Sequence, residues 1–139
     1  MKKFFVDTNV ILSWLISSRD THSEATSFMK EIFMGRVEGF VSSHSLSDIF
    51  YIARKSYSVE ERKNFLLLIA SNFQIVPENQ NDFFEVLSSP TFFDIEDGLQ
   101  MRCAEKVVVD YIVTENLKDF SSSRVPAVDT ASAMQIILN

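Results

Sequence analysis

Four separated segments of this chain carry acidic side chains in positions that suit metal-ion chemistry. Asp7 directly follows the apolar run Phe4-Phe5-Val6, and the other acids are Asp48, the group Asp94, Glu96 and Asp97, and Asp119. Carboxylates that lie within a few ångströms repel one another, and they stay ionised together only when a cation lies among them. Oxygen ligands of this kind select Mg²⁺ or Mn²⁺ rather than zinc. If the fold brings these segments together, we expect a divalent ion to bind there.

Each acid taken alone has an ordinary structural explanation. Acidic residues in the first turn of a helix stabilise it by about 0.3–1 kcal/mol through the helix dipole, and Asp after a strand is a common turn residue. It is the joint occurrence of the acids that favours a metal site. The two histidines, His22 and His44, are not spaced as a pair with Cys103 for zinc. For His44 we expect a capping or surface role, with a phosphate contact as the alternative.

Strands and helices alternate along the chain. Apolar runs bounded by polar residues, Pro or Gly predict strands at residues 4–6, 40–41, 73–76, 111–114 and 125–128. Helical spacing of apolar residues predicts two helices in residues 10–37, with Gly35 capping the second, and further helices at residues 58–72, 81–89, 94–106 and 129–138. Serines after Val41 are able to cap a helix that runs toward Lys55. Ser58 and Glu61 form a capping-box pattern, and Asp129 is the expected N-cap of the last helix.

This alternation predicts an α/β fold: a three-layer α/β/α sandwich with a central parallel sheet of four to five strands. We find no repeat or linker, and we expect one domain over residues 1–139. Right-handed connections place the carboxyl ends of parallel strands along one edge, where ligands bind in open sheets. Asp7 lies at that edge in this arrangement, and we expect the other acids to lie there too.

Composition narrows the classes of protein. A formal net charge of −6 does not favour nucleic-acid binding by charge alone, so metal ions would have to cover some of the carboxylates. The single Cys103 excludes an internal disulfide and fits a reducing cytoplasm, where we expect the protein to act. No apolar run approaches the roughly 20 residues that a membrane-spanning helix needs, and we see no signal peptide.

Four motifs resemble those of the PIN-domain family, and they occur in the family's order and spacing: "FFVDTNVIL", "SLSDIFYIARK", "DIEDGLQMRCAEK" and "YIVTENLKDF". The chain is most similar to small prokaryotic members, including VapC-type toxins of toxin–antitoxin pairs. The resemblance implies a metal-dependent ribonuclease that uses Mg²⁺ or Mn²⁺ and leaves 5′-phosphate and 3′-hydroxyl ends. Carried over residue by residue, it implies four catalytic acids and three supporting polar residues, namely Asp7, Asp48, Asp97 and Asp119, with Asn9, Thr114 and Asn116.

The sequence departs from the family pattern at three positions. Asp48 stands where Glu is frequent, so its shorter carboxylate reaches a metal only through water. Gly98 replaces an Ala and weakens its helix by up to about 1 kcal/mol. Glu115 stands where an Arg commonly precedes the Asn, which replaces a possible phosphate contact with a repulsive charge.

The expected chemistry is hydrolysis of phosphodiester bonds in single-stranded RNA. A carboxylate-bound divalent ion lowers the pKa of its water and covers charge that develops on phosphate. Our hypothesis assigns the main metal site to Asp7 and Asp97, with Asp119 completing it or holding a second ion. Asp48 orients or deprotonates the attacking water. Arg54 and Lys55, about two turns beyond Asp48, are candidate RNA contacts, although a solvated basic surface is an equal alternative.

Two other functions remain as alternatives. A PIN-like module that binds RNA or protein without cutting is the first, although retention of all four acids argues against it. A haloacid-dehalogenase-type phosphatase is the second, but its general acid position is occupied by Asn9, which cannot donate the required proton. The family resemblance also implies a small antitoxin as partner and a homodimer.

Overall fold

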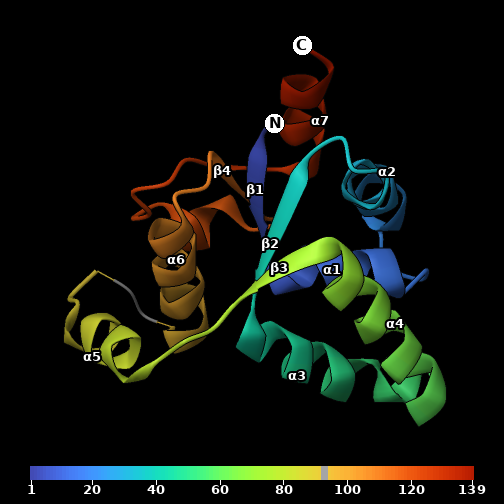
Figure 1. The fold of residues 1–139 in the computed structure, drawn as a ribbon, viewed down its shortest axis with the longest axis horizontal. Helices are drawn as coiled ribbons and strands as arrows, with labels where there is room; N and C mark the ends of the chain where they lie inside the picture. The colour runs from blue at the N-terminus through green and yellow to red at the C-terminus, as the bar shows by residue number, and fades with distance from the viewer. Residues whose placement is uncertain (92–93) are drawn as a thin grey trace.

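The computed structural model describes residues 1–91 and 94–139, and five strands in these residues form one parallel sheet. The strands are β1 (Lys3–Val6), β2 (Glu38–Ser42), β3 (Phe73–Val76), β4 (Tyr111–Val113) and β5 (Ala127–Val128). Their order is β3-β2-β1-β4-β5, which puts β1 in the middle of the sheet (Figure 1). Every strand pairing is parallel, so the carboxyl ends of all five strands lie along one edge, as predicted.

Helices connect successive strands and cover both faces of the sheet (Figure 1). They are α1 (Thr8–Leu15), α2 (His22–Phe33), α3 (Ser43–Ile52), α4 (Val59–Asn72), α5 (Gln80–Ser88), α6 (Ile95–Val107) and α7 (Thr130–Leu138), with short 3₁₀ helices η1 (Ala53–Lys55) and η2 (Leu117–Phe120). The predicted α/β class and parallel sheet are therefore confirmed. The helix expected to run toward Lys55 ends at Ile52 and continues as η1.

Alternate residues of β1 supply two separate hydrophobic cores. Phe4 and Val6 belong to a core formed with α1, α2, α3, α4 and α7, whereas Phe5 belongs to the core beneath α6. This division follows from the two-residue period of a strand, which points successive side chains to opposite faces. Cys103 of α6 is fully buried in the second core, as the sequence predicted for a small apolar residue. Full burial of each β1 phenylalanine contributes about 1.5–3 kcal/mol and fixes the strand that ends at Asp7.

Helix caps agree with the sequence in two places and differ in one. The Ser58 hydroxyl accepts from the Glu61 backbone N–H at 3.1 Å, and the Glu61 carboxylate accepts from the Ser58 N–H at 3.0 Å, which completes the predicted capping box. Asp129 caps α7 by accepting from the backbone N–H of Ser132 at 2.8 Å. The prediction for α3 was wrong in its detail, since Ser42 occupies the N-cap position but its hydroxyl pairs with Ser45 Oγ at 2.8 Å instead of a helix N–H.

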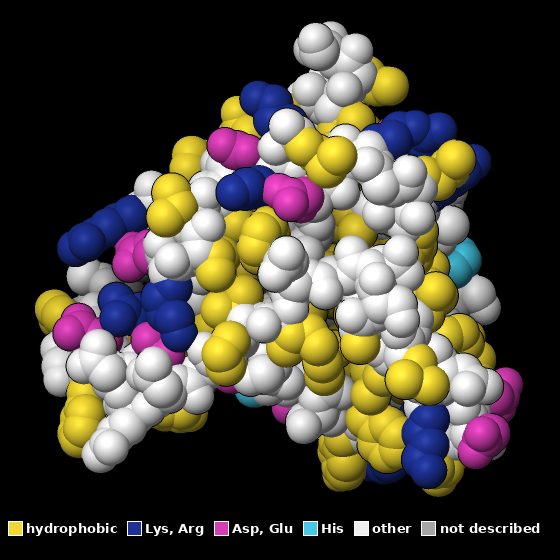
Figure 2. All heavy atoms as spheres, viewed as in Figure 1, with side chains coloured by type: hydrophobic (Ala, Val, Ile, Leu, Met, Phe, Trp, Pro, Cys, Tyr) yellow, Lys and Arg dark blue, Asp and Glu magenta, His cyan; other side chains and the backbone are white. Residues whose placement is uncertain are grey.

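The face that carries β3 and α4 presents apolar side chains to solvent (Figure 2). Leu67 is 64% exposed, Leu68 43% and Ile75 39%. Grouped exposed apolar side chains mark surfaces that contact other molecules. No helix within the two described ranges combines the length and apolar character needed to cross a membrane.

Candidate metal centre

Asp7 is a buried carboxylate that two side-chain donors hold in place. It follows β1 and is the N-cap residue of α1, with an exposed fraction of 3%. Its Oδ1 accepts from Nε2 of Gln100 at 2.8 Å, and its Oδ2 accepts from Oγ1 of Thr114 at 2.9 Å. Burial raises the pKa of Asp7, and the bonds from Gln100 and Thr114 oppose that rise. The carboxylate is thus oriented before any ligand arrives.

The register of the sheet places Thr114 beside Asp7. Val6 of β1 pairs with Val113 of β4, so the residues that follow the two strands meet at the sheet edge. The backbone N–H of Asp7 donates to the carbonyl of Val113 at 3.0 Å, and the Asn116 N–H donates to Thr114 Oγ1 at 3.0 Å. Thr114 therefore links Asp7 to the segment that leads into η2.

Asp97 and Asp119 share an electrostatic environment with Asp7. The pKa of Asp97 is raised to about 7, first by burial and then by the charges of Asp94, Asp119 and Asp7. Asp119, on η2, accepts from Nδ2 of Asn116 at 2.6 Å. Asp7, Asp97 and Asp119 are therefore near enough at this edge for their charges to act on one another, but among the described residues the acids with ligand atoms within 4.8 Å of one another belong to a different group, His44, Asp48 and Glu96.

Asp48 lies with a different pair of residues. It groups with His44 and Glu96, and one ligand atom from each of the three lies within 4.8 Å of the others. Burial and then the charge of Asp48 raise the pKa of Glu96. The adjacent acids of α6 therefore differ in one neighbour, since the charge of Asp119 acts on Asp97 and that of Asp48 on Glu96, while the charges of Asp7 and Asp94 raise the pKa of both.

The sequence analysis missed two polar residues at this edge, the fully buried Gln100 and the partly buried Glu78. Gln100 is fully buried, and besides its bond to Asp7 its Oε1 accepts from the Thr8 N–H at 3.2 Å. Gln100 follows Asp97 by three residues, so both lie on one face of the helix. This spacing could have identified Gln100 as a site residue from the sequence. Glu78 follows β3 and accepts from Ser43 and from His44 Nδ1. Because β2 and β3 are parallel neighbours, the residues after each strand meet, and that was the signal for Glu78.

Lysine and arginine side chains do not neutralise the clustered acids. The ion pairs within the described part of the chain are Arg36–Glu31, His44–Glu78, Arg102–Asp82, Lys106–Asp82 and Arg124–Glu105. None of them includes Asp7, Asp48, Glu96, Asp97 or Asp119. Mutually repelling oxygen ligands without a basic partner form the donor set of a hard divalent cation, so the residues present fit Mg²⁺ or Mn²⁺.

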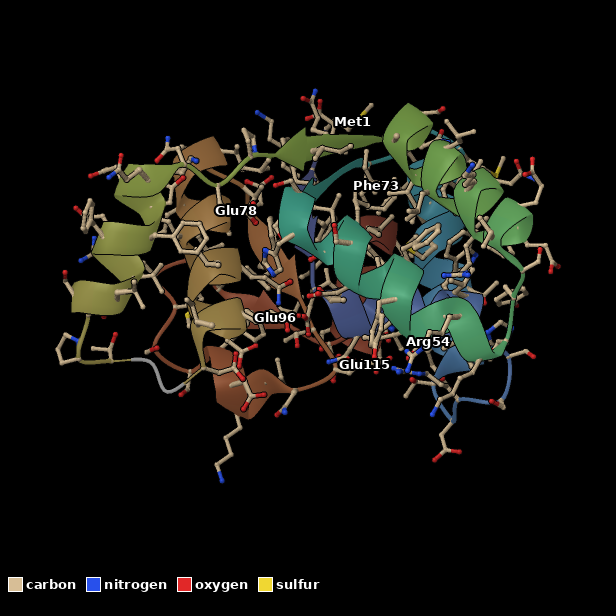
Figure 3. The ribbon with its side chains drawn as sticks, turned by 90° about the horizontal axis from the view of Figure 1, so that it is seen from below. Met1, Arg54, Phe73, Glu78, Glu96 and Glu115 are labelled. Carbon is tan, nitrogen blue, oxygen red and sulfur yellow. The ribbon has the colours of Figure 1, made fainter. Side chains whose placement is uncertain are left out.

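The remaining predicted residues lie around this edge. Figure 3 views the molecule from that side, with Glu78 and Glu96 between α6 and α3 and Arg54 at the far end of α3. The Arg54 guanidinium carbon lies 3.7 Å above the Tyr51 ring centroid, and Lys55 is exposed in η1. Asn9 is exposed on α1. Arg54 and Lys55 remain predicted RNA contacts.

Glu115 lies on the loop between β4 and η2, and its carboxylate accepts from the Thr21 hydroxyl at 2.6 Å. Both residues are near the solvent-exposed side of the edge, because this hydrogen bond is exposed. The negative charge that departs from the family pattern therefore lies on the solvent-exposed side of this edge.

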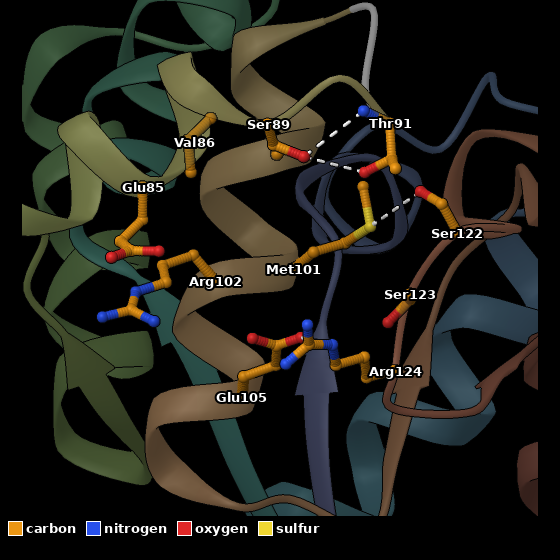
Figure 4. Close-up of a pocket in the computed structure, with 11 residues that line it drawn as sticks. Glu85, Val86, Ser89, Thr91, Met101, Arg102, Glu105, Ser122, Ser123 and Arg124 are labelled. Carbon is orange, nitrogen blue, oxygen red and sulfur yellow. Dashed lines mark hydrogen bonds and ion pairs between the residues drawn. The ribbon is translucent and has the colours of Figure 1, made fainter.

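A cavity of about 200 Å³ lies between α5, α6 and the segment after η2 (Figure 4). Its α6 residues are Gly98, Met101, Arg102 and Glu105, so the cavity contains none of the clustered acids. Ser122 donates to the Met101 sulfur at 3.8 Å along one wall. This cavity is separate from the candidate metal centre.

Comparison with known proteins supports the family resemblance that the four sequence motifs indicated. A family profile described as "PIN domain" matches residues 3–118. No match to a curated protein is found. The matched range contains Asp7, Asp48 and the acids Asp94, Glu96 and Asp97, and it ends one residue before Asp119 and before β5 and α7.

Solved structures with the same fold come from bacterial toxin–antitoxin systems. VapBC2 of Rickettsia felis, bound to a DNA fragment from its promoter, is 16% identical with a TM-score of 0.67, over 91% of this chain and 98% of that one. VapC20 of Mycobacterium tuberculosis, a Sarcin-Ricin loop cleaving toxin, is 10% identical with a TM-score of 0.69, over 88% and 95%. A toxin–antitoxin complex from Klebsiella pneumoniae is 25% identical with a TM-score of 0.65, over 91% and 96%.

Proposed function

Since the chain belongs to the PIN-domain family, we propose that it is a metal-dependent endoribonuclease that acts on single-stranded RNA as the toxin of a toxin–antitoxin pair. The observation that carries this proposal is the cluster of Asp7, Asp97 and Asp119, which no lysine or arginine neutralises within the described residues. Similar folds in toxin–antitoxin complexes support it. We treat residues 1–139 as one such domain.

Each residue has a role that its position supports. Asp7, Asp97 and Asp119 hold Mg²⁺ or Mn²⁺ through their carboxylate oxygens. Gln100 and Thr114 keep the Asp7 carboxylate in the orientation that the ion requires, because each donates to one of its oxygens. A bound ion of this kind supplies a water of lowered pKa and covers negative charge on the phosphate.

Proton transfer falls to the carboxylates that border the ion-binding acids. Asp48 lies beside Glu96 on the neighbouring part of the edge and orients the attacking water or accepts its proton. Asn116 donates to Asp119 and restricts the orientation of that carboxylate. Arg54 and Lys55 are exposed, and we assign them contacts with the RNA backbone beyond the acidic residues.

We also propose a small antitoxin as protein partner and a homodimer as the assembled form. Neighbouring folds occur in complexes with antitoxins, and this chain exposes apolar side chains such as Leu67, Leu68 and Ile75. An amphipathic antitoxin helix buries such side chains in a groove, and a cationic side chain from it is suited to the acidic edge. The exposed apolar surface supports contacts of both kinds.

The experiment that tests the enzymatic proposal is cleavage of single-stranded RNA by purified Asp7→Asn protein in Mg²⁺ or Mn²⁺. We expect the rate to fall by orders of magnitude, because a metal ligand is lost while the Asn side chain still accepts from Gln100 or Thr114. Thermal unfolding checks that the variant is folded. Wild-type protein in EDTA should lose activity to the same extent.

The matched control is Asp110→Asn at the opposite edge of the sheet, where the carboxylate accepts from the Lys3 backbone N–H at 2.8 Å. Asn can accept the same bond, so cleavage should be unchanged. Unchanged cleavage by the Asp7→Asn variant contradicts the assigned site. Tight RNA binding without cleavage by the wild-type protein in Mn²⁺ favours the non-catalytic module instead.

A further inference from the structure

His44, Asp48 and Glu96 form a mixed nitrogen and oxygen cluster beside the acids of the proposed nuclease site. Their ligand atoms lie within 4.8 Å of one another, and all three residues are partly buried. His44 and Asp48 stand four residues apart on α3, so both side chains lie on one face of that helix. Glu96 reaches the pair from the first turn of α6. Two rigid helices therefore supply the three side chains.

Glu78 fixes the orientation of the His44 ring. Nδ1 of His44 lies 2.5 Å from Oε1 of Glu78, and the same carboxylate accepts from the Ser43 hydroxyl. Although burial opposes it, the bonds from Ser43 and His44 lower the pKa of Glu78 and keep it ionised. Metal-binding histidines characteristically donate their second ring N–H to a carboxylate in this way, which fixes the ring and leaves the other nitrogen for the ion.

The other ring nitrogen of His44 has no hydrogen-bond partner among the described residues, although the atom is buried. Buried polar atoms are almost always paired, so an orphaned one requires an explanation. When Nδ1–H donates to Glu78, a neutral imidazole presents a lone pair at Nε2. That lone pair and the carboxylates of Asp48 and Glu96 make up three ligands.

We infer that His44, Asp48 and Glu96 bind a divalent transition-metal ion, with Nε2 of His44 as its nitrogen ligand and Glu78 as the carboxylate that orients the ring. Metal–ligand bonds of about 2.0–2.2 Å place ligand atoms about 3.0–3.6 Å apart, so atoms near the 4.8 Å limit of this group move toward one another when the ion binds. Three protein ligands leave positions open for water. Imidazole nitrogen favours Mn²⁺, Co²⁺ or Zn²⁺ over Mg²⁺, which prefers oxygen alone.

This site uses none of Asp7, Asp97 and Asp119, although it shares Asp48 with the proposed catalytic residues, and metal binding to it can be measured without nuclease activity. The test uses Mn²⁺ as probe and pulsed EPR without RNA, in the Asp7→Asn background so that the other set is disabled. We expect nitrogen modulation from a coordinated imidazole, and we expect excess Mg²⁺ to leave it in place. In the His44→Gln variant of that background the modulation should vanish and the Mn²⁺ affinity should fall at least about tenfold.

His22→Gln is the matched control, because His22 is the other histidine and its Nδ1 bonds only the Ser13 carbonyl, at 2.8 Å. Glu96→Gln should weaken Mn²⁺ binding, whereas Glu38→Gln at the opposite edge of the sheet should not. Glu78→Gln should weaken it by about 10–100-fold while the ligands remain. Thermal unfolding without metal verifies the fold of each variant.

Absence of nitrogen modulation in the folded Asp7→Asn protein overturns the inference, as does modulation that survives His44→Gln. Retained modulation together with lost RNA cleavage in Asp7→Asn supports both proposals. Retained modulation with intact cleavage supports the His44 site and contradicts the assignment of Asp7. The experiment can therefore contradict the nuclease proposal and the His44 metal site independently of each other.

Discussion

The amide nitrogen of Gln100 lies 2.8 Å from Oδ1 of Asp7 and joins α6 to the end of the central strand. Gln100 is also bonded through its Oε1 to the backbone N–H of Thr8 at 3.2 Å. One fully buried side chain therefore fixes both the proposed metal ligand and the start of α1.

Replacing Gln100 with Met keeps the side-chain length and removes both hydrogen bonds. We expect the free energy of unfolding to fall by about 1–3 kcal/mol, because the Asp7 carboxylate and the Thr8 N–H lose partners. Loss of the donor also raises the pKa of Asp7 further, so RNA cleavage should drop and its pH profile should move to higher pH. Gln135→Met, at an exposed position on α7, is the control and should change neither measurement. If the pH profile of cleavage does not change, Gln100 does not act on the protonation of Asp7 in the reaction.

The raised pKa of Asp97, about 7 against a model-compound value of 3.8, predicts how stability depends on pH without metal. Between about pH 4 and pH 7 the folded protein binds a proton at Asp97 that the unfolded chain has released, so the free energy of unfolding falls as pH rises through this window. Asp97→Asn should flatten that dependence and stabilise the metal-free protein at pH 8 by about 1–2 kcal/mol after solvent screening.

Chemical denaturation in EDTA at several pH values measures this effect. Asp110→Asn should retain the wild-type slope. Added Mg²⁺ or Mn²⁺ should raise the unfolding temperature of the wild type more at pH 8 than at pH 5, because the ligands bind metal in their ionised form. A metal effect that is equal at both pH values would argue against Asp97 as a ligand.

Glu115 presents a negative charge beside the proposed RNA path. Neutralising it by Glu115→Gln should tighten binding of a single-stranded RNA oligonucleotide by roughly two- to fivefold at low salt, because a charge repelling phosphate is removed. Fluorescence anisotropy in Ca²⁺ measures binding while cleavage is suppressed. Glu38→Gln makes the same charge change at the opposite sheet edge and should leave the affinity unchanged. The gain should disappear at about 1 M salt, and a gain that persists there is not electrostatic.

Gly39 allows α2 to approach β2 closely. A Cβ at this position would lie 2.8 Å from Phe73 Cε2 and 2.9 Å from two methyl carbons of Ile32, closer than side chains pack. Gly39→Ala should therefore lower the free energy of unfolding by about 1–3 kcal/mol through overpacking. Urea denaturation measures the loss, and Gly39→Ala combined with Ile32→Val should recover part of it by providing space. No loss in the single variant would contradict this packing.

The order and type of the elements could be predicted from the sequence because local signals agreed with the fold. The apolar run at residues 4–6, the stop at Pro77 and the Ser58–Glu61 capping box each specify structure through short-range physics. The hydroxyl of Ser42 shows the limit of such signals. This hydroxyl forms a hydrogen bond with Ser45 and not with a backbone N–H of α3. Its pairing depends on the position of Ser45, which is itself held by a hydrogen bond to Thr8 from a distant part of the chain.

The site could be predicted in outline, since parallel strands deliver Asp7 and the segment of Thr114 to one edge whatever the details. The sequence could not predict which of the neighbouring acids Glu96 and Asp97 would lie near Asp48. Glu96 and Asp97 are neighbours on α6 and point about 100° apart, and only the rotation of that helix against the sheet decides which one meets Asp48. That rotation is set by the packing of Met101, Cys103 and Ala104 in the core beneath it.

Hydroxyl groups of Thr8, Ser42 and Ser45 form a buried chain, with Oγ1 of Thr8 2.6 Å from Oγ of Ser45. This chain joins the first turn of α1, which begins directly after Asp7, to the start of α3, the helix that carries Asp48. A cation that binds at this edge would therefore find the starts of both helices already held in place, and its binding would not have to order them. Amide hydrogen exchange in the first turns of α1 and α3 should consequently be slow already in metal-free protein.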